Sequence, residues 1–197
     1  MIARHQTTLM LALALALVPS ATFAGGQMSL IEFERKVARD YRAIPHVLPE
    51  QLEASLLAPS TLLLIDARAE DEIAVSRLPG AVAVDPDIDT DDFISRFGAA
   101  ANDKDVVIYC SVGVRSSKLA TRVREAMMAK GARRVANLQG GIFAMHNTGR
   151  GLVDRLGHTD LVHPYSWWWS GYIDFDNLTR YEPRRAAAPL PDRASNP

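Results

Sequence analysis

Cysteine is almost absent from the chain. Cys110 is the single cysteine among 197 residues, and one thiol cannot close a disulfide within the chain. Three interpretations of Cys110 therefore remain: a small buried residue, a link to another chain, or a reactive thiol. With 48% hydrophobic residues, a chain of this length buries a core without disulfide bridges.

A dominant charge is also missing, since 22 basic residues face 23 acidic ones. A net charge of −1 provides no broad basic surface, so we expect no nucleic acid partner. His158 and His163 are not at metal-ligand spacing with a cysteine or a cluster of carboxylates. The sequence therefore predicts neither a metal site nor any other cofactor.

Long hydrophobic runs are absent except near the N-terminus. Arg4 and His5 precede an apolar run over 9–18, and small residues follow as far as Ala24. This order is typical of a secretory signal peptide, and the run is shorter than the roughly 20 residues that span a bilayer. We predict a signal peptide over 1–24, cleaved near Ala24, with no stable membrane insertion. The mature protein is then exported, and periplasmic in a Gram-negative bacterium.

The apolar residues that are present follow two alternating patterns. Continuous apolar runs predict buried strands at 61–65, 81–84, 105–109 and 134–138. Amphipathic or capped segments predict helices at 29–42, 49–57, 70–76, 90–97, 116–130 and 141–146. Strands that alternate with helices favour an α/β domain with a central, mainly parallel sheet flanked by helices.

Regions outside this pattern divide the chain further. Residues 25–47 are predicted to form a helical extension, 151–182 an aromatic extension, and 183–197 a disordered tail. The adjacent Trp167, Trp168 and Trp169 cannot all face one way, so we expect at least one to be exposed. Exposed aromatic residues are favoured at interfaces. We expect the extension to pack over the domain, and the three tryptophan side chains are candidates for contact with a protein partner as the alternative.

The surroundings of Cys110 favour a reactive thiol. Cys110 follows a predicted strand and precedes a loop that leads into a helix, and sites in open α/β sheets lie at the carboxyl ends of strands. Loop amides and a helix N-terminus at such a position stabilise an anion, which favours the nucleophilic thiolate. Arg115 adds a positive charge, Gly113 permits a tight loop, and Ser116 is a candidate helix cap.

The segment CSVGVRS at 110–116 resembles the C-x-x-G-x-R-S loop of single-domain members of the rhodanese family. Segment 65–73 resembles that family's D-x-R-x-x-x-E motif, 77–81 its H-I-P-G-A turn with arginine in place of histidine, and 135–142 its V-x-N-L-x-G-G-I segment. The four motifs occur in the family's order. The resemblance covers 48–150 and implies a three-layer fold with the sheet between helices.

The resemblance also implies an activity. In that family the cysteine accepts a sulfane sulfur as a persulfide and passes it to a thiol or another thiophilic acceptor, without a cofactor. A small-molecule sulfur donor and a thiol acceptor are therefore the expected partners of Cys110. Arg68 is a candidate at the mouth of the site, Asp66 is expected to give structural support, and Glu72 to fix a loop or lie on a helix surface. The expected substrate-binding residues of the loop are Ser111, Val112, Gly113, Val114, Arg115 and Ser116.

Loop length and loop composition refine this expectation. Four residues separate Cys110 from Arg115, whereas phosphatases and arsenate reductases that resemble this fold enclose five, which favours sulfur over phosphate chemistry. Val112 and Val114 leave the loop apolar, so we expect thiosulfate to bind weakly. The donor is therefore left open between thiosulfate and a protein or small-molecule persulfide. Two alternatives remain, a catalytically silent binding module and a redox-responsive thiol.

Overall fold

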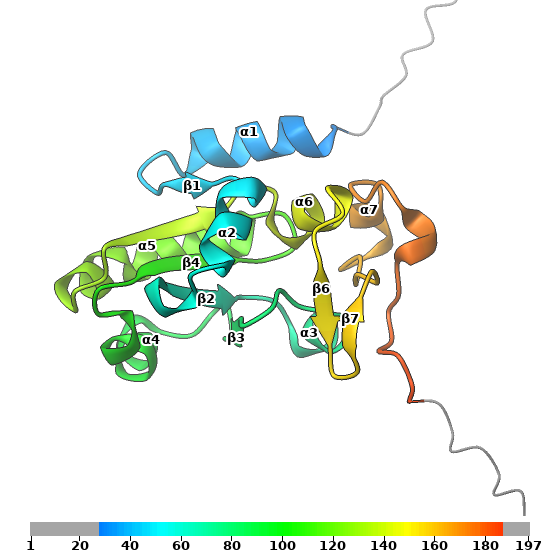
Figure 1. Ribbon diagram of the computed structural model, residues 1–197. Helices are drawn as coiled ribbons and strands as arrows, with labels where there is room; N and C mark the ends of the chain where they lie inside the picture. Colours follow the sequence, from blue (N-terminus) through cyan, green and yellow to red (C-terminus); the bar gives the residue numbers. More distant parts are fainter. Residues whose placement is uncertain (1–27, 187–197) are drawn as a thin grey trace, which may run out of the picture.

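A computed structural model describes residues 28–186, and its centre is a five-stranded sheet (Figure 1). The strand order is β1-β5-β4-β2-β3, and every neighbouring pair is parallel. This arrangement confirms the α/β class with a central parallel sheet. The strands are β1 (His46–Val47), β2 (Leu62–Asp66), β3 (Val82–Ala83), β4 (Asp105–Tyr109) and β5 (Arg134–Leu138).

The helices from Leu30–Asp40 to Gly141–Asn147 follow the predicted order along the chain, whereas no helix was predicted at Trp167–Ser170. The helix α5 begins two residues before its predicted start at Ser116, because Gly113, with φ of 99°, already turns the chain into the helix. Ser116 therefore lies inside α5 and does not cap it, contrary to the expectation from the sequence. The helices are α1 (Leu30–Asp40), α2 (Pro49–Leu56), α3 (Glu70–Val75), α4 (Thr90–Phe97), α5 (Val114–Ala129), α6 (Gly141–Asn147) and α7 (Trp167–Ser170).

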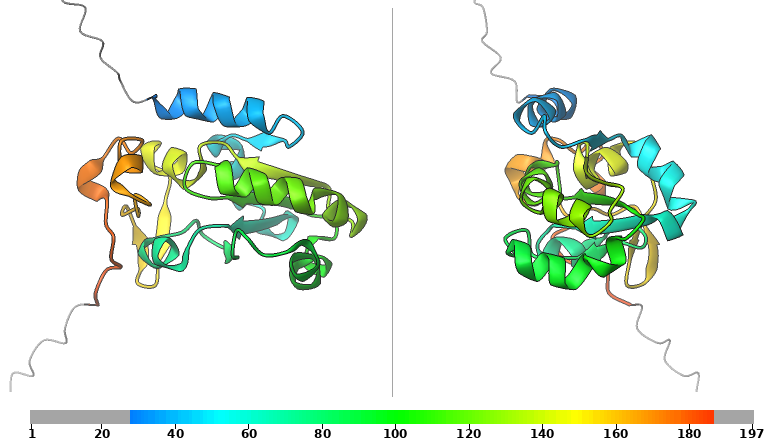
Figure 2. Two further views of the ribbon diagram at one scale, coloured as in Figure 1. Left: turned by 180° about the vertical axis from the view of Figure 1, so that it is seen from behind. Right: turned by 90° about the vertical axis from the view of Figure 1, so that its left-hand side faces the viewer.

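The sheet separates two hydrophobic cores, because successive strand side chains point to opposite faces. Leu64, Val107 and Leu138 belong to the core that also contains Leu52 of α2 and Ile142 of α6. The core on the opposite face joins Ile65, Val106 and Ile108 to Phe93 of α4 and Leu119 of α5. The right-hand view of Figure 2 shows these helices on the two sides of the sheet. Burial on both faces explains why the strands are continuous apolar runs.

The two extensions meet although they are far apart in the sequence. Phe33 of α1 contacts Trp169 of α7, with ring centroids 5.3 Å apart, and also contacts Tyr172 at 5.4 Å. The C-terminal extension also contains a hairpin that the sequence did not predict, formed by β6 (Leu152–Asp154) and β7 (Gly157–Thr159). Both extensions therefore belong to the packed structure around the sheet.

The structure describes part of the predicted C-terminal tail but none of the predicted signal peptide. Arg184 pairs with Asp154 of β6 at 2.6 Å, so the second residue of the predicted disordered tail is held by an ion pair. The rest of that tail from 187 onward and the predicted signal peptide at 1–24 lie outside the described residues. Among the helices of the described part, none has the length and apolar character needed to cross a membrane.

Candidate active site

Cys110 directly follows β4, at the carboxyl end of the central strand, and its side chain is buried. The backbone N–H of Gly113 donates a hydrogen bond to its Sγ atom at 3.2 Å, and Ser116 Oγ lies 3.4 Å from the same sulfur. The 16-residue helix α5 begins at this loop, so its positive N-terminal end faces the thiol. An amide donor and a helix N-terminus stabilise negative charge on sulfur.

The helix α6 fixes the first half of the loop from outside. The amide of Ile142 donates to the Cys110 carbonyl at 2.9 Å, and that of Phe143 donates to the Ser111 carbonyl at 3.1 Å. Gly141 makes this approach possible, since a Cβ atom there would lie 2.2 Å from the Cys110 carbonyl oxygen. The glycine pair at 140–141 thus lets one helix terminus satisfy two loop carbonyls.

A buried network supports Ser116 from the opposite side. Its hydroxyl donates to Asn137 Oδ1 at 2.6 Å, and Asn137 Nδ2 lies 3.1 Å from His46 Nδ1. Since the amide nitrogen can only donate, His46 accepts through Nδ1 and is neutral, with its proton on Nε2. Burial lowers the pKa of His46, partly opposed by the Tyr41 carbonyl, which agrees with this state. Neither residue was predicted from the sequence, although an asparagine inside an otherwise apolar strand was a usable signal.

The positive charge of the loop is paired rather than free. Arg115 donates to both carboxylate oxygens of Glu72, at 2.7 and 2.9 Å, and to Ser111 Oγ at 2.9 Å. Its guanidinium also lies over the ring of Tyr165, with 4.7 Å from Cζ to the ring centroid. Burial alone raises the pKa of Glu72, but the hydrogen bonds and charge of Arg115 outweigh it and hold that pKa below its usual value. Glu72 is therefore the ionised group that fixes the loop and neutralises Arg115.

A cavity of about 180 Å³ opens onto the sulfur. Four of the expected loop residues line the cavity together with Cys110. Gly113 and Ser116 are not among the lining residues, but both contact the Cys110 sulfur. Tyr165 and Trp169 of the C-terminal extension also line the cavity, whereas the sequence had suggested either packing over the domain or an interface role for that segment. The lining residues are Cys110, Ser111, Val112, Val114, Arg115, Tyr165 and Trp169.

Arg68 does not reach this cavity, which corrects the expectation that it lines the mouth of the site. Its guanidinium donates to the two carboxylate oxygens of Asp66 at 2.9 and 2.7 Å, and to the Ser76 carbonyl at 2.7 Å. Both side chains of this pair are fully buried. Tyr109 donates to Asp66 at 2.5 Å, and its own oxygen accepts from the amide of Leu78 at 3.0 Å. Asp66 therefore ties together the strand ends around the Cys110 loop, as structural support.

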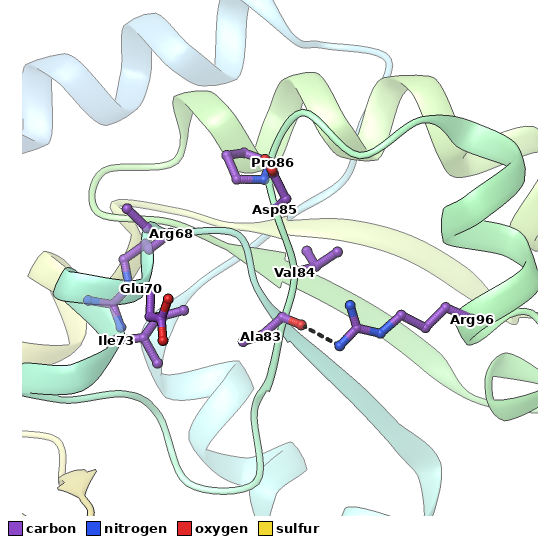
Figure 3. Close-up of a pocket in the computed structure, with 9 residues that line it drawn as sticks. Arg68, Glu70, Ile73, Ala83, Val84, Asp85, Pro86 and Arg96 are labelled. Carbon is purple, nitrogen blue, oxygen red and sulfur yellow. Dashed lines mark hydrogen bonds between the residues drawn. The ribbon is translucent and has the colours of Figure 1, made fainter.

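A larger hollow of about 700 Å³ lies elsewhere, between α3, the chain after β3 and α4 (Figure 3). Arg96 points across it and donates to the Ala83 carbonyl at 3.1 Å, while Arg68 at its other end is held by Asp66. The residues that line this hollow include no cysteine, serine, threonine, histidine or lysine. Within residues 28–186, no three His, Cys, Asp or Glu side chains cluster as a metal site would require.

Comparison with known proteins places this geometry in a family. The model of the rhodanese-like domain matches residues 48–148. A curated sulfurtransferase of Allochromatium vinosum is 34% identical over 108 residues, which cover 55% of this chain and 94% of that protein.

Two solved structures are also similar. The thiosulfate sulfurtransferase of Pseudomonas aeruginosa is 22% identical, with a TM-score of 0.49, and the match covers 62% of this chain and 22% of that one. A rhodanese-like domain protein of Staphylococcus aureus is 26% identical, with a TM-score of 0.43, over 57% of this chain and 99% of that one. Because the family model covers half of the chain and the curated relative matches almost end to end, the chain belongs to the family of rhodanese-like domain proteins.

Proposed function

We propose that the protein is a sulfurtransferase that carries sulfane sulfur as a persulfide on Cys110 and passes it to a thiol or another thiophilic acceptor. The observation that carries this proposal is the position of Cys110 Sγ, which receives the Gly113 N–H at the start of α5 and lines a cavity. The similarity to the sulfurtransferase of Allochromatium vinosum supports it.

The chemistry proceeds in two balanced steps. The Cys110 thiolate attacks the outer sulfur of a thiosulfate, thiosulfonate or persulfide donor, and the donor's S–S bond breaks. The electron pair leaves with sulfite, sulfinate or thiolate, and Cys110 becomes a persulfide anion. The acceptor then attacks the outer sulfur, and the electron pair of that bond returns to Cys110 as a thiolate. Covalent catalysis of this kind gives ping-pong kinetics, and the Gly113 amide together with the α5 N-terminus stabilises the anionic sulfur.

Mass spectrometry of the intact protein tests the proposal. Incubation with thiosulfate, methanethiosulfonate or glutathione persulfide should add about 32 Da, one sulfur atom on the thiolate. Cyanide should remove this mass as thiocyanate, and Cys110→Ser should never gain it. If none of the three donors changes the mass of the wild-type protein, the proposal is wrong.

A catalytically silent binding module is the second candidate. Trp167 and Trp168 favour it, since their rings stack at 4.2 Å with 66% and 65% of their surfaces exposed. A partner that is lost with Trp167→Ala, and retained by Cys110→Ser, would support this function if persulfide formation also fails.

The site of action is a separate proposal. The pattern of residues 1–24 supports export to a periplasm. Fractionation of expressing cells, followed by N-terminal sequencing, should find a mature protein in the periplasm that begins close to residue 25. Full-length protein in the cytoplasm would contradict it.

A further inference from the structure

One wall of the Cys110 cavity is aromatic and lies outside the matched domain at 48–148. Tyr165 and Trp169 form it, with ring centroids 6.3 Å apart and nearly perpendicular. Trp169 packs against Phe33 of α1, at 5.3 Å, and against Tyr172, at 5.5 Å. The N-terminal and C-terminal extensions therefore combine to build this wall, and Figure 1 shows α7 close to the N-terminal end of α1.

Tyr165 is held in place at a conformational cost. Its φ of 63° lies in the left-handed region, which bulky residues seldom adopt. Its amide donates to His163 Nδ1 at 3.0 Å, and its ring lies over Arg115. Strained backbone of this kind persists where the surroundings fix it, and is often associated with function.

The electrostatics of the cavity disfavour a doubly charged donor. Arg115 is the one cationic side chain among the lining residues, and it is already engaged by Glu72, Ser111 and Tyr165. A dianion such as thiosulfate would lose hydration on entry without a free positive side chain to compensate it. A single negative charge can still be met by the loop amide and the α5 N-terminus.

The size and lining of the cavity suit an organic group. Its volume is about 180 Å³, and an apolar cavity of roughly 150 Å³ is enough for benzene. Val112 and Val114 face this space together with the aromatic wall. An aromatic ring beside Tyr165 and Trp169 gains edge or stacking contacts that small groups do not make.

We propose that the two extensions make the Cys110 cavity selective for sulfur donors with one negative charge and an apolar, ring-sized organic group. This rests on the proposed sulfurtransferase function. Tyr165 and Trp169 are the specificity residues, and Phe33 is a positioning residue that acts through Trp169. In the reaction, the Cys110 thiolate attacks the terminal sulfur of R–SO₂–S⁻, the S–S bond breaks, and R–SO₂⁻ leaves with the electron pair.

Benzenethiosulfonate and methanethiosulfonate are a matched pair of donors, because they share the charge and the reacting bond. Each kcat/KM is divided by the rate constant of the same donor with free cysteine, which removes the difference in leaving-group reactivity. The wild-type protein should then prefer the benzene donor by about tenfold. Trp169→Leu and Tyr165→Leu should each bring the preference below about threefold, and Phe33→Leu should lower it partly. Trp167→Leu, on the same helix but outside the cavity, should leave it unchanged.

Binding of the sulfinate products to Cys110→Ser tests the cavity without sulfur transfer. Calorimetry should show tighter binding of benzenesulfinate than of methanesulfinate, and added Trp169→Leu should remove the difference. Equal binding of the two sulfinates, or a donor preference near one in the wild-type protein, would overturn the proposal even if Cys110 forms a persulfide. If benzenesulfinate binds more tightly but Cys110 forms no persulfide with any donor, the proposed sulfurtransferase function is wrong, while the proposed preference of the cavity for ring-sized groups stands. The wild-type comparisons decide the question if a variant does not fold.

Discussion

Glu72 Oε2 accepts a hydrogen bond of 2.7 Å from Arg115 Nη1, which joins α3 to the loop that carries Cys110. The Glu72 side chain is 1% exposed and the Arg115 side chain 24%. The pair therefore places a buried negative charge beside the loop's one arginine. This relationship, more than the arginine itself, sets the charge that a donor meets.

Replacement of Glu72 should strengthen the binding of anionic sulfur donors. Glu72→Gln keeps the size of the side chain but replaces one of the two oxygens that accept from Arg115 with an amide NH2, which cannot accept, and the charge of Arg115 is no longer cancelled. We expect the KM for thiosulfate to fall severalfold, with a smaller change for methanethiosulfonate, because the effect scales with donor charge. The free energy of unfolding should fall by about 2 kcal/mol, since a charged hydrogen-bond partner is lost. Steady-state kinetics and urea denaturation measure the two effects.

The control for this change is Glu70→Gln, which removes an exposed carboxylate from the same helix. It should alter the KM of neither donor, and surface substitutions of this type change stability by less than about 0.5 kcal/mol. A thiosulfate KM that stays constant or rises in Glu72→Gln would show that the pair does not limit anion binding.

Acid should weaken the protein through the same carboxylate. The pKa of Glu72 in the folded protein lies below its ordinary value of 4.5, so the unfolded chain binds a proton more readily than the folded chain. Its stabilising contribution is therefore complete above about pH 4.5 and is lost as the pH falls through the lower, folded value. Unfolding free energies measured from pH 6 to pH 3 should decrease less steeply in Glu72→Gln than in the wild-type protein. Parallel curves would contradict this.

The sequence predicted the centre of the fold better than its edges. The runs at 105–109 and 134–138 coincide with β4 and β5, because strands buried on both faces need apolar residues throughout. By contrast, β1 spans two residues and β6 and β7 three each. Segments so short contain no periodicity, and their pairing is decided by contacts with distant parts of the chain.

In the candidate site, too, contacts between distant parts of the chain could not be predicted from the sequence. Motif and loop position singled out Cys110 and its loop as the candidate site, but the partner of Arg115 is 43 residues away and only the fold brings Glu72 beside it. Arg68 carried an equally visible charge, yet Asp66, two residues before it, holds it in the interior. The aromatic segment was conspicuous in the sequence. Which of its rings faces the cavity depends on Phe33, from the opposite end of the chain.

His46 should make stability depend on pH near neutrality. Burial lowers its pKa below the ordinary value of 6.5, so protons bind the unfolded chain more readily. His46 therefore causes no loss of unfolding free energy above about pH 6.5. Below that pH the unfolding free energy decreases until the pH reaches the lower pKa of His46 in the folded protein. His46→Gln removes this group, and its stability should decline less between pH 7 and pH 5 than that of the wild-type protein. His163, whose pKa burial also lowers, remains in both proteins and cancels from the difference. Equal slopes in denaturation experiments would refute the prediction.

The contact between Gly141 and Cys110 should be the most sensitive backbone position in the site. In Gly141→Ala the new Cβ atom would lie 2.2 Å from the Cys110 carbonyl oxygen and 2.6 Å from that of Ser111, at a φ of 57°. Overpacking and left-handed strain together should lower the free energy of unfolding by about 3 kcal/mol. The loop must also move, so the rate of persulfide formation on Cys110 should fall at least about tenfold, as a small displacement of a reacting group does.

Gly149→Ala is the control that distinguishes the effect of left-handed backbone strain from that of the close contact with the Cys110 loop. Gly149 has φ of 68°, but a Cβ atom there would meet no other atom within 4 Å. This variant should lose about 1 kcal/mol of stability from backbone strain alone and form the persulfide at the wild-type rate. Intact-protein mass spectrometry over time, at a temperature where both variants are folded, compares the two. If Gly141→Ala acquires sulfur as fast as Gly149→Ala, the α6 terminus does not position the Cys110 loop for reaction.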